Sequence, residues 1–402
     1  MKLESVPPLS LYVHIPWCLR KCPYCDFNSH ERRGELPEGQ YVDALVADLE
    51  STLPRVWGRR IGTIFVGGGT PSLFSPAAIE RLLTAVRTRI PVEPDAEITL
   101  EANPGTFEAE RFRGFRDAGV NRLSLGVQSF DDASLAAIGR VHGADEARRA
   151  LDAALAIFPT VNADLMYALP GQSVEAALAD VREAVSRGVP HVSAYHLTLE
   201  PDTHFHRFPP QLPGEDAAAD MQEAIEAQLA AAGYEHYETS AFARPGERAR
   251  HNVNYWTFGD YIGIGAGAHG KISFRERIVR EVRQRKPETY MRTALAGDAL
   301  HESREVAEAE LPFEFMLNAL RLVEGFRAAL FTRRTGLPIA VVEPQLRAAE
   351  ARGLLVRDHA SIRPTARGQR FLNELLELFL APASPRPARV INIVAPGTAR
   401  PS

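Results

Sequence analysis

Short apolar runs alternate with longer amphipathic runs over the first 233 residues. The short runs are apolar at most positions, which is typical of parallel strands covered by helices. The longer runs space their apolar residues as a helix does. The pattern predicts strands at 11–15, 63–68, 97–103, 122–128, 162–170 and 191–200. It predicts a helix after each strand, at 41–52, 76–88, 107–119, 145–158, 174–188 and 217–233.

Six consecutive strand–helix units predict an α/β fold, either a partial (β/α)6 TIM-type barrel or a doubly wound sheet. Residues 234–300 begin with a segment rich in aromatic residues and glycine, and we expect an insertion and a linker there. Residues 301–380 contain three helical runs, a hairpin pattern and a closing helix. This order predicts a small, mostly helical, winged-helix-like domain. The tail, 381–402, is rich in Pro, Ala and Arg, and we expect it to be loose.

The composition is that of a soluble globular protein, with 45% hydrophobic and 24% charged residues among 402. A net charge of -5 indicates no general attraction to nucleic acid or anionic lipid. The C-terminal domain has only a weak basic excess, with ten arginines against seven acids between Leu311 and Leu380. A nucleic-acid-binding regulator is therefore disfavoured. The N-terminus has no signal-peptide layout, so we expect a cytoplasmic protein.

The three cysteines of the chain, Cys18, Cys22 and Cys25, follow the first predicted strand with the spacing C-x3-C-x2-C. An odd count rules out a complete disulfide framework. Thiolates suit zinc or an iron–sulfur cluster. Zinc needs a fourth ligand, which His14 or His30 could supply. A [4Fe–4S] cluster on three thiolates instead leaves one iron open to a small molecule.

Further polar and glycine positions follow the ends of the other predicted strands. The turn "GGGTPS" (67–72) lets backbone amides approach a ligand closely, because glycine has no side chain. Side chains at the carboxyl ends of barrel strands are typical of binding or catalysis. Any one of the charged residues could equally form a structural ion pair. The residues that end the strands or follow them shortly after are Glu101, Gln128, Arg140 and Asp164.

The cysteine spacing and the glycine turn resemble the signature of the radical S-adenosylmethionine (SAM) superfamily. In that superfamily the open iron chelates SAM, and an electron from the cluster cleaves the sulfonium to give a 5′-deoxyadenosyl radical. The resemblance implies a partial barrel over 1–233 and a [4Fe–4S] cluster on the three cysteines. It implies a SAM site formed by Tyr12, Tyr24, Gly68, Gly69, Thr70, Glu101, Gln128, Arg140 and Asp164.

The strings "YVHIPWC", "EANPGT", "RLSLGVQSF", "DLMYALPGQ" and "GIGAGAHG" resemble a narrower family, which contains oxygen-independent coproporphyrinogen III oxidase and the heme chaperones called HemW. The oxidase pattern has a further cysteine where this chain has Phe27, and a longer arm before the first cysteine. Both departures favour the heme-chaperone branch. That branch implies binding of heme and its transfer to an acceptor protein, such as a respiratory heme enzyme, with peripheral membrane contact through that acceptor.

The alternative is the oxidase activity itself, the oxidative decarboxylation of coproporphyrinogen III to protoporphyrinogen IX. The number of SAM molecules, one or two, stays open in either case.

The string "HNVNYW" (251–256) resembles the motif associated with heme binding in the chaperones, which implies heme contact by His251, Asn252, Tyr255 and Trp256. A neutral imidazole suits heme iron, and aromatic rings pack well on a porphyrin. A buried structural His–Asn pair is the alternative. The other histidines that could bind heme are His142, His196 and His269. The same resemblance makes 234–300 the porphyrin-related segment and 301–380 a HemN-type C-terminal domain.

Overall fold

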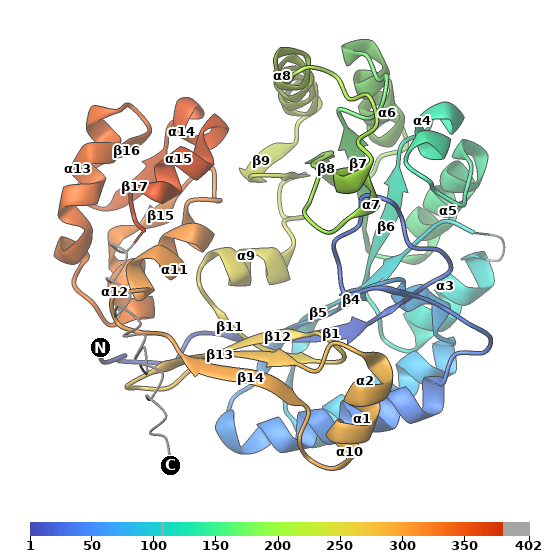
Figure 1. Cartoon of the computed structure of the whole chain (residues 1–402), viewed down its shortest axis with the longest axis horizontal. Helices are drawn as coiled ribbons and strands as arrows, with labels where there is room; N and C mark the ends of the chain where they lie inside the picture. The colour runs from blue at the N-terminus through green and yellow to red at the C-terminus, as the bar shows by residue number, and fades with distance from the viewer. Residues whose placement is uncertain (106–107, 381–402) are drawn as a thin grey trace, which may run out of the picture.

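One curved sheet of twelve strands organises the molecule (Figure 1). The structure, a computed structural model, describes residues 1–105 and 108–380, so the expected loose tail lies outside the described residues. The strand order is β14-β13-β12-β11-β1-β4-β5-β6-β7-β8-β10-β9. The strands of this sheet are β1 (Leu9–Ile15), β4 (Ile61–Gly68), β5 (Val92–Ala102), β6 (Arg122–Gln128), β7 (Thr160–Tyr167), β8 (His191–His196), β9 (Glu235–Glu238), β10 (Ala241–Ala243), β11 (Asp260–Ile264), β12 (His269–Ser273), β13 (Ile278–Arg283) and β14 (Leu300–Glu305).

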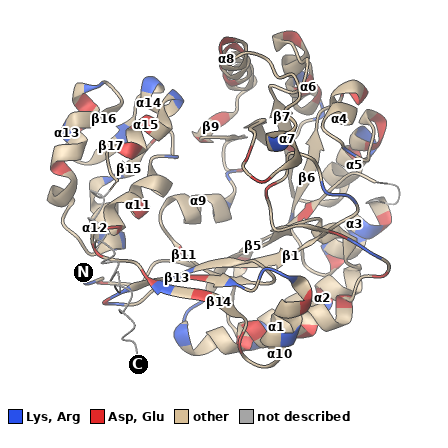
Figure 2. Cartoon of the chain, in the orientation of Figure 1, with Lys and Arg blue, Asp and Glu red and all other residues tan. Residues whose placement is uncertain are grey.

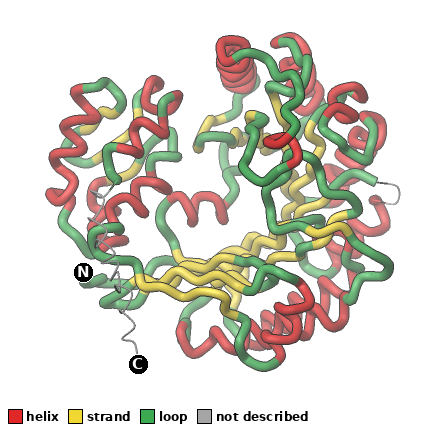
Figure 3. Tube along the Cα trace, in the orientation of Figure 1, coloured by secondary structure: helices red, strands yellow, loops and turns green. Residues whose placement is uncertain are grey.

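The middle of the sheet is parallel, from β11 through β1 and β4 to β8. The outer strands at both edges pair antiparallel. Most of the yellow strands in Figure 3 belong to this curved sheet, and the short yellow strands at the left belong to a separate three-stranded sheet. The curved sheet is a partial TIM-type barrel, so the predicted fold class is confirmed.

Helices cover the convex side of the sheet, where apolar side chains from strands and helices form the main core. Charged residues of both signs lie on many of these helices (Figure 2). The helices between the strands and at the sheet edges are α1 (Glu38–Thr52), α2 (Pro76–Arg89), α3 (Glu108–Asp117), α4 (Asp132–Ala137), α5 (Ala144–Ile157), α6 (Val174–Ser186), α7 (His204–Arg207), α8 (Glu215–Ala231), α9 (Arg250–Trp256) and α10 (Pro287–Leu295), with 3-10 turns η1 (Leu53–Arg55) and η2 (Pro71–Leu73).

The concave side of the sheet carries polar side chains. Because side chains alternate across a strand, Ser124 of β6 and Asn162 and Asp164 of β7 share this side. Asn162 donates to the Ser124 hydroxyl at 2.8 Å and to the Asp164 carboxylate at 2.8 Å. The short helix α9 packs over part of the same side, against β1, β4 and β11. The concave side therefore carries hydrogen-bonding side chains, whereas the convex side packs into the apolar core.

The expected boundary at residue 233 does not coincide with an edge of the sheet. Strand β11 pairs with β1 in parallel, with Leu9 opposite Asp260, and β12 to β14 continue the sheet beyond it. An exposed edge on β1 would present unpaired backbone groups, and β11 satisfies them. Residues 234–300 thus extend the barrel sheet.

The C-terminal residues form a separate layer with its own apolar core. Its elements are α11 (Leu311–Ala319), β15 (Phe326–Arg327), α12 (Ala328–Thr335), η3 (Ile339–Val342), α13 (Glu343–Ala351), β16 (Leu355–Arg357), β17 (Ser361–Pro364), α14 (Ala366–Arg370) and α15 (Leu372–Glu377). Phe315 joins this core to the barrel through an edge-to-face contact with Phe258, 5.8 Å between ring centroids. The predicted mostly helical C-terminal domain is confirmed. None of the helices in 1–105 and 108–380 combines the length and apolarity needed to cross a membrane.

Candidate functional site

The three cysteines lie on one loop that is closed at its base. Strand β2 (Trp17–Cys18) pairs with β3 (His30–Glu31), and Arg32 N donates to Cys18 O at 2.9 Å. A turn within the loop brings Cys25 N to 3.1 Å from Cys22 O. All three thiols are half-buried and none forms a disulfide. Burial raises the pKa of the Cys18 and Cys25 thiols.

The donor set of this loop suits a cluster better than a single ion. Among the described residues, no three His, Cys, Asp or Glu side chains lie close enough together to hold one metal ion. In a four-iron cluster each thiolate binds a different iron, so its ligands stand farther apart. His14 is unsuited to be a zinc ligand, because Nε2 donates to Asn28 O at 2.9 Å and Nδ1 accepts from the Tyr12 hydroxyl at 2.7 Å. These two hydrogen bonds argue against His14 as a zinc ligand, whereas His30 Nε2 is buried without a hydrogen-bond partner among the described residues.

The glycine turn packs directly against the cysteine loop. Gly69 N donates to Ile15 O at 2.8 Å and Thr70 N to Trp17 O at 2.8 Å. Gly68 has a φ of +118°, and a Cβ there would lie 2.6 Å from the His14 ring. A Cβ at Gly69 would lie 2.6 Å from Trp17 O. The turn must therefore be glycine to lie beside the cysteines.

Two carboxyl groups face the pocket from neighbouring parts of the sheet. Glu101, at the end of β5, accepts from Gly68 N at 3.0 Å. Burial, together with the charge of Asp164, raises the pKa of Glu101 to about 8. Burial also raises the pKa of Asp164, although Asn162 and Ser124 donate to it. Without a cation in the pocket, Glu101 is mostly protonated at pH 7, so the site can take up a positive charge by releasing a proton.

Arg140 links the cysteine loop to the strands. Its Nη2 donates to Asn103 Oδ1 and to Gly126 O, both at 2.7 Å, and its Nη1 lies 3.6 Å from Cys22 Sγ. Asn103 in turn donates to the Thr70 hydroxyl at 2.9 Å. One guanidinium thus connects the cluster loop, the glycine turn and β6. Asn103 was not predicted from the sequence, although it lies in the quoted string "EANPGT".

These groups surround one pocket of about 520 Å³ at the carboxyl ends of the strands. Tyr24 forms part of the wall and packs near Phe205 of α7, 6.4 Å between ring centroids. Gln128 also lines the pocket and has a φ of +69°, where the pairing of β6 with β7 shifts register. The predicted residues that line the pocket are Cys18, Cys22, Tyr24, Cys25, Gly68, Gly69, Thr70, Glu101, Gln128, Arg140 and Asp164.

Tyr12 lies outside the wall of this pocket. Its ring stacks on Phe65 of β4, 5.9 Å between centroids, and its hydroxyl donates to His14. Tyr12 and His14 share the concave side of β1, and His14 stands between Tyr12 and the cysteine loop. Tyr12 is therefore separated from the glycine turn by the His14 ring.

The predicted heme motif forms α9, away from the pocket wall. Glu97 of β5 accepts from Arg250 N at 2.8 Å, from His251 N at 3.1 Å and from His251 Nδ1 at 2.6 Å. The N-cap residue of the helix, Ala249, has no polar side chain that could accept these hydrogen bonds. Glu97 of β5 therefore caps the N-terminus of α9. The sequence analysis did not identify Glu97 as a candidate.

The His251 ring is buried and stacks on Phe65, 4.5 Å between ring centroids. Burial lowers its pKa, so it is neutral at pH 7. Asn252 donates to the Tyr237 hydroxyl at 3.3 Å. The Tyr255 hydroxyl and Trp256 Nε1 are buried and have no hydrogen-bond partner among the described residues. Two orphaned donors on one helical turn indicate a place where a ligand can supply acceptors.

The other candidate histidines differ in surroundings. His196 is exposed at the pocket. His142 is buried and its Nε2 donates to Val127 O at 3.1 Å, while its Nδ1 is buried without a hydrogen-bond partner among the described residues. His269 is exposed on β12.

Comparison with known proteins agrees with this geometry. The radical SAM superfamily profile matches residues 12–184 and the HemN C-terminal domain profile matches residues 306–371. The heme chaperone HemW of Escherichia coli is 50% identical over 94% of this chain and 100% of its own length. The heme chaperone HemW of Haemophilus influenzae is 46% identical over 94% of this chain and 99% of its own length.

This chain belongs to the HemW family of radical SAM proteins.

The predicted family is confirmed, and HemW relatives extend beyond bacteria. The mouse mitochondrial radical S-adenosyl methionine domain-containing protein 1 is 36% identical over 91% of this chain and 86% of its own length. The structure of coproporphyrinogen III oxidase (HemN) from Escherichia coli superposes with a TM-score of 0.79 at 25% identity, covering 93% of this chain and 90% of that one. The radical SAM domain implies a [4Fe–4S] cluster and SAM as cofactors.

Proposed function

We propose that this HemW-family protein is a heme chaperone that holds a [4Fe–4S] cluster, SAM and heme and passes heme to an acceptor protein. The observation that carries the proposal is the 50% identity to a heme chaperone over the whole of that protein's length. A second feature supports it. Phe27, where the oxidase pattern has a further cysteine, is 59% exposed at the rim of the cluster pocket. The phenyl ring of Phe27 cannot bind a metal, whereas a cysteine thiolate could.

The cluster would rest on Cys18, Cys22 and Cys25, and SAM on the predicted pocket residues. When bound, the two groups supply one-electron chemistry at the mouth of the barrel. The chain's own contribution is orientation and charge. The glycine turn brings Gly69 against the cysteine loop, and Arg140 fixes that loop to β6. Glu101 loses its proton when a cationic amine approaches, because the new charge offsets its burial.

Heme would contact the α9 motif. The Glu97 carboxylate fixes the proton of His251 on Nδ1 and leaves Nε2 as the metal-binding nitrogen, the arrangement found at metal-ligating histidines. The orphaned Tyr255 hydroxyl and Trp256 indole N–H can donate to heme carboxylates. The His251 ring is only 4% exposed, so its binding to iron requires α9 to shift away from Phe65.

The proposal extends to the partners. The acceptor is a heme protein, and a respiratory heme enzyme fits the requirement. Membrane contact is then peripheral and occurs through that acceptor, and the chaperone itself works in the cytoplasm. No nucleic-acid partner is proposed, because the C-terminal domain shows charges of both signs (Figure 2).

The first test separates the chaperone from the oxidase. Cluster-reconstituted protein is incubated without oxygen with SAM, a one-electron reductant and coproporphyrinogen III, and the tetrapyrroles are separated by chromatography. We expect no protoporphyrinogen from protein whose cluster absorbance is intact. Catalytic formation of protoporphyrinogen would overturn the chaperone proposal in favour of the oxidase.

The second test concerns heme. Heme is titrated into wild type, His251→Ala and the control His359→Ala, which replaces an exposed histidine in the C-terminal domain. We expect a changed heme spectrum and weaker binding only in His251→Ala, with cluster absorbance and circular dichroism as checks on folding. Identical titrations of folded His251→Ala and wild type would remove His251 from the heme site.

A further inference from the structure

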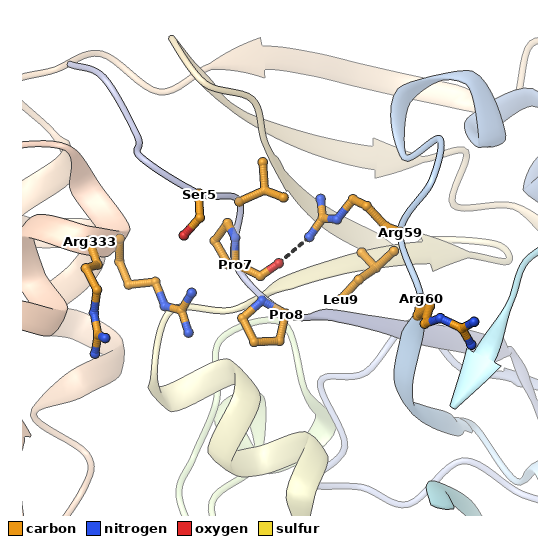
Figure 4. A pocket seen from close by; sticks show the side chains of 9 residues that line it. Ser5, Pro7, Pro8, Leu9, Arg59, Arg60 and Arg333 are labelled. Atoms are coloured by element: carbon orange, nitrogen blue, oxygen red, sulfur yellow. Dashed lines mark hydrogen bonds between the residues drawn. The ribbon is translucent and has the colours of Figure 1, made fainter. Parts of the chain in front are cut away.

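A second cleft lies at the amino ends of the strands, away from the cysteine loop (Figure 4). It has a volume of about 510 Å³ and is bordered by the N-terminal segment, the turn before β4 and the last turn of α12. Strand β1 begins at Leu9 in this cleft and ends at Ile15, just before the cysteines. A strand of seven residues spans about 20 Å, so the cleft is separate from the cluster pocket.

Four arginines from two segments line the cleft: Arg59 and Arg60 from the turn before β4, and Arg333 and Arg334 from α12. Two of them are fixed. Arg59 donates to Asp260 Oδ2 at 2.8 Å and to Pro7 O at 2.6 Å. Arg334 Nε donates to Thr257 O at 3.1 Å. A guanidinium has five N–H donors, so both keep donors for a ligand.

The other two arginines are uncommitted. Arg60 and Arg333 lie at the two ends of the cleft and extend away from Pro8 in Figure 4. Arg60 has one distant partner, Glu93 at 4.0 Å, and both side chains are exposed, so the pair contributes little. Arg333 is exposed and has no hydrogen bond or ion pair with residues of the described ranges. Both side chains are long enough to rotate over a bound ligand.

The positive charge of the cleft exceeds the negative charge around it. Asp260, the buried carboxylate beside Arg59, also binds Lys271 Nζ at 2.9 Å, so two cations share one anion. Burial lowers the pKa of Arg334, Asp260 partly offsets this, and the charges of Arg333 and Arg59 lower it further. An anion placed among these guanidiniums would relieve their repulsion.

We propose that this cleft is a binding site for a phosphate-bearing ligand. Guanidinium groups bind phosphate oxygens in paired hydrogen bonds, and Arg is preferred over Lys where such geometry matters. Here four guanidiniums approach from two segments, the turn before β4 and the last turn of α12, which suits a tetrahedral anion with several oxygens better than a planar carboxylate. Two fixed arginines form the floor and two free ones close over it.

A bound phosphate would join parts of the fold that are far apart in sequence. The N-terminal segment runs between the barrel and the C-terminal domain, since Leu3 N donates to Arg275 O at 2.7 Å and a Cβ at Gly336 would lie 2.7 Å from Lys2 N. Arg60 belongs to the barrel and Arg333 to α12 of the C-terminal domain. One ligand held by both arginines would stabilise the C-terminal domain against the barrel.

The test uses the full-length, cluster-loaded protein and inorganic pyrophosphate as the probe. Binding is measured by calorimetry and by the shift in thermal unfolding, in wild type and in Arg60→Gln/Arg333→Gln. The control is Arg292→Gln/Arg367→Gln, which removes two exposed arginines outside the cleft. We expect the first double variant to bind on the order of tenfold more weakly or worse. We expect the control to match wild type and binding to weaken with salt.

A second arm identifies the source of the phosphate. Sedimentation with phosphatidylglycerol vesicles is compared with phosphatidylcholine vesicles for the same proteins. Loss of pyrophosphate binding in the cleft variant supports a soluble phosphate ligand, and loss of phosphatidylglycerol binding alone supports a lipid headgroup. The proposal is overturned if wild type binds neither probe, or if the cleft variant binds both as wild type does.

Discussion

Replacing Glu97 by Gln tests how the heme-motif helix is held on the sheet. Burial alone would raise the pKa of Glu97, but the hydrogen bond from His251, the charge that His251 carries when protonated, Arg122 and the Arg250 N–H together lower it to about 2. Against the ordinary value of 4.5, and at about 1.4 kcal/mol per pH unit, about 3 kcal/mol is an upper bound for the contribution of the ionised carboxylate, because His251 is neutral at pH 7 and its charge is then absent. The hydrogen bonds lead to a similar magnitude. Glu97 accepts from three N–H groups, and a Gln side chain at this position would leave at least one of them unpaired, at a cost of about 1–3 kcal/mol.

The pH dependence gives the prediction a sign. The pKa of Glu97 is lower in the folded protein than in the unfolded chain, so its contribution is complete above about pH 4.5 and disappears as the pH falls toward about 2. We expect Glu97→Gln to lower the free energy of unfolding by about 1–3 kcal/mol at pH 7 and by less at pH 3.5, measured with urea on cluster-free protein. Glu93→Gln, on the same strand but exposed, is the control. Equal unfolding free energies for Glu97→Gln and wild type at pH 7, or a difference that does not shrink in acid, would refute the reasoning.

Three further outcomes are expected. Gly68→Ala should lower the iron content per chain severely, because the new Cβ would lie 2.6 Å from the His14 ring at a φ of +118°; iron and sulfide analysis checks this. In wild type without SAM, raising the pH from about 4.5 through 8 should lower stability, because burial raises the folded pKa of Glu101 to about 8, and Glu101→Gln should remove this part of the pH dependence in urea titrations. Arg321→Ala should cost about 1 kcal/mol in urea unfolding, because the guanidinium lies 4.4 Å from the Trp256 ring; an unchanged midpoint would show that the contact is not stabilising.

The barrel strands could be predicted from the sequence because each carries a local apolar pattern. Strands β1 and β4 to β8 were all expected, with ends that differ by a few residues. The helices α4 and α7 were not expected, because six and four residues are too few to show a helical period. The pairing of Leu9 with Asp260 was also missed, since no local pattern reports a partner about 250 residues away in the chain.

The candidate site divides in the same way. The cysteines and the glycine turn were expected together because the carboxyl ends of parallel strands meet at one edge. Tyr12 was expected at the pocket, but its side chain lies behind His14. Its position is set by contacts with His14 of β1 and Phe65 of β4, which the local sequence pattern does not report. Glu97 was missed, although it lies four residues before Glu101 on one strand. Positions separated by an even number share a face of a strand, and that signal could have found it.

Strand β5 connects the two functional regions of the fold. Glu97 caps the heme-motif helix and Glu101 faces the cluster pocket, and four residues of strand separate them by about 13 Å. Strand β4 repeats the connection, because Phe65 stacks on His251 while Gly68 binds Glu101. Both strands are rigid members of the sheet, so a shift of α9 that frees His251 must break its contacts with Glu97 and Phe65. The glycine turn and the contacts that hold His251 thus lie on the same two strands.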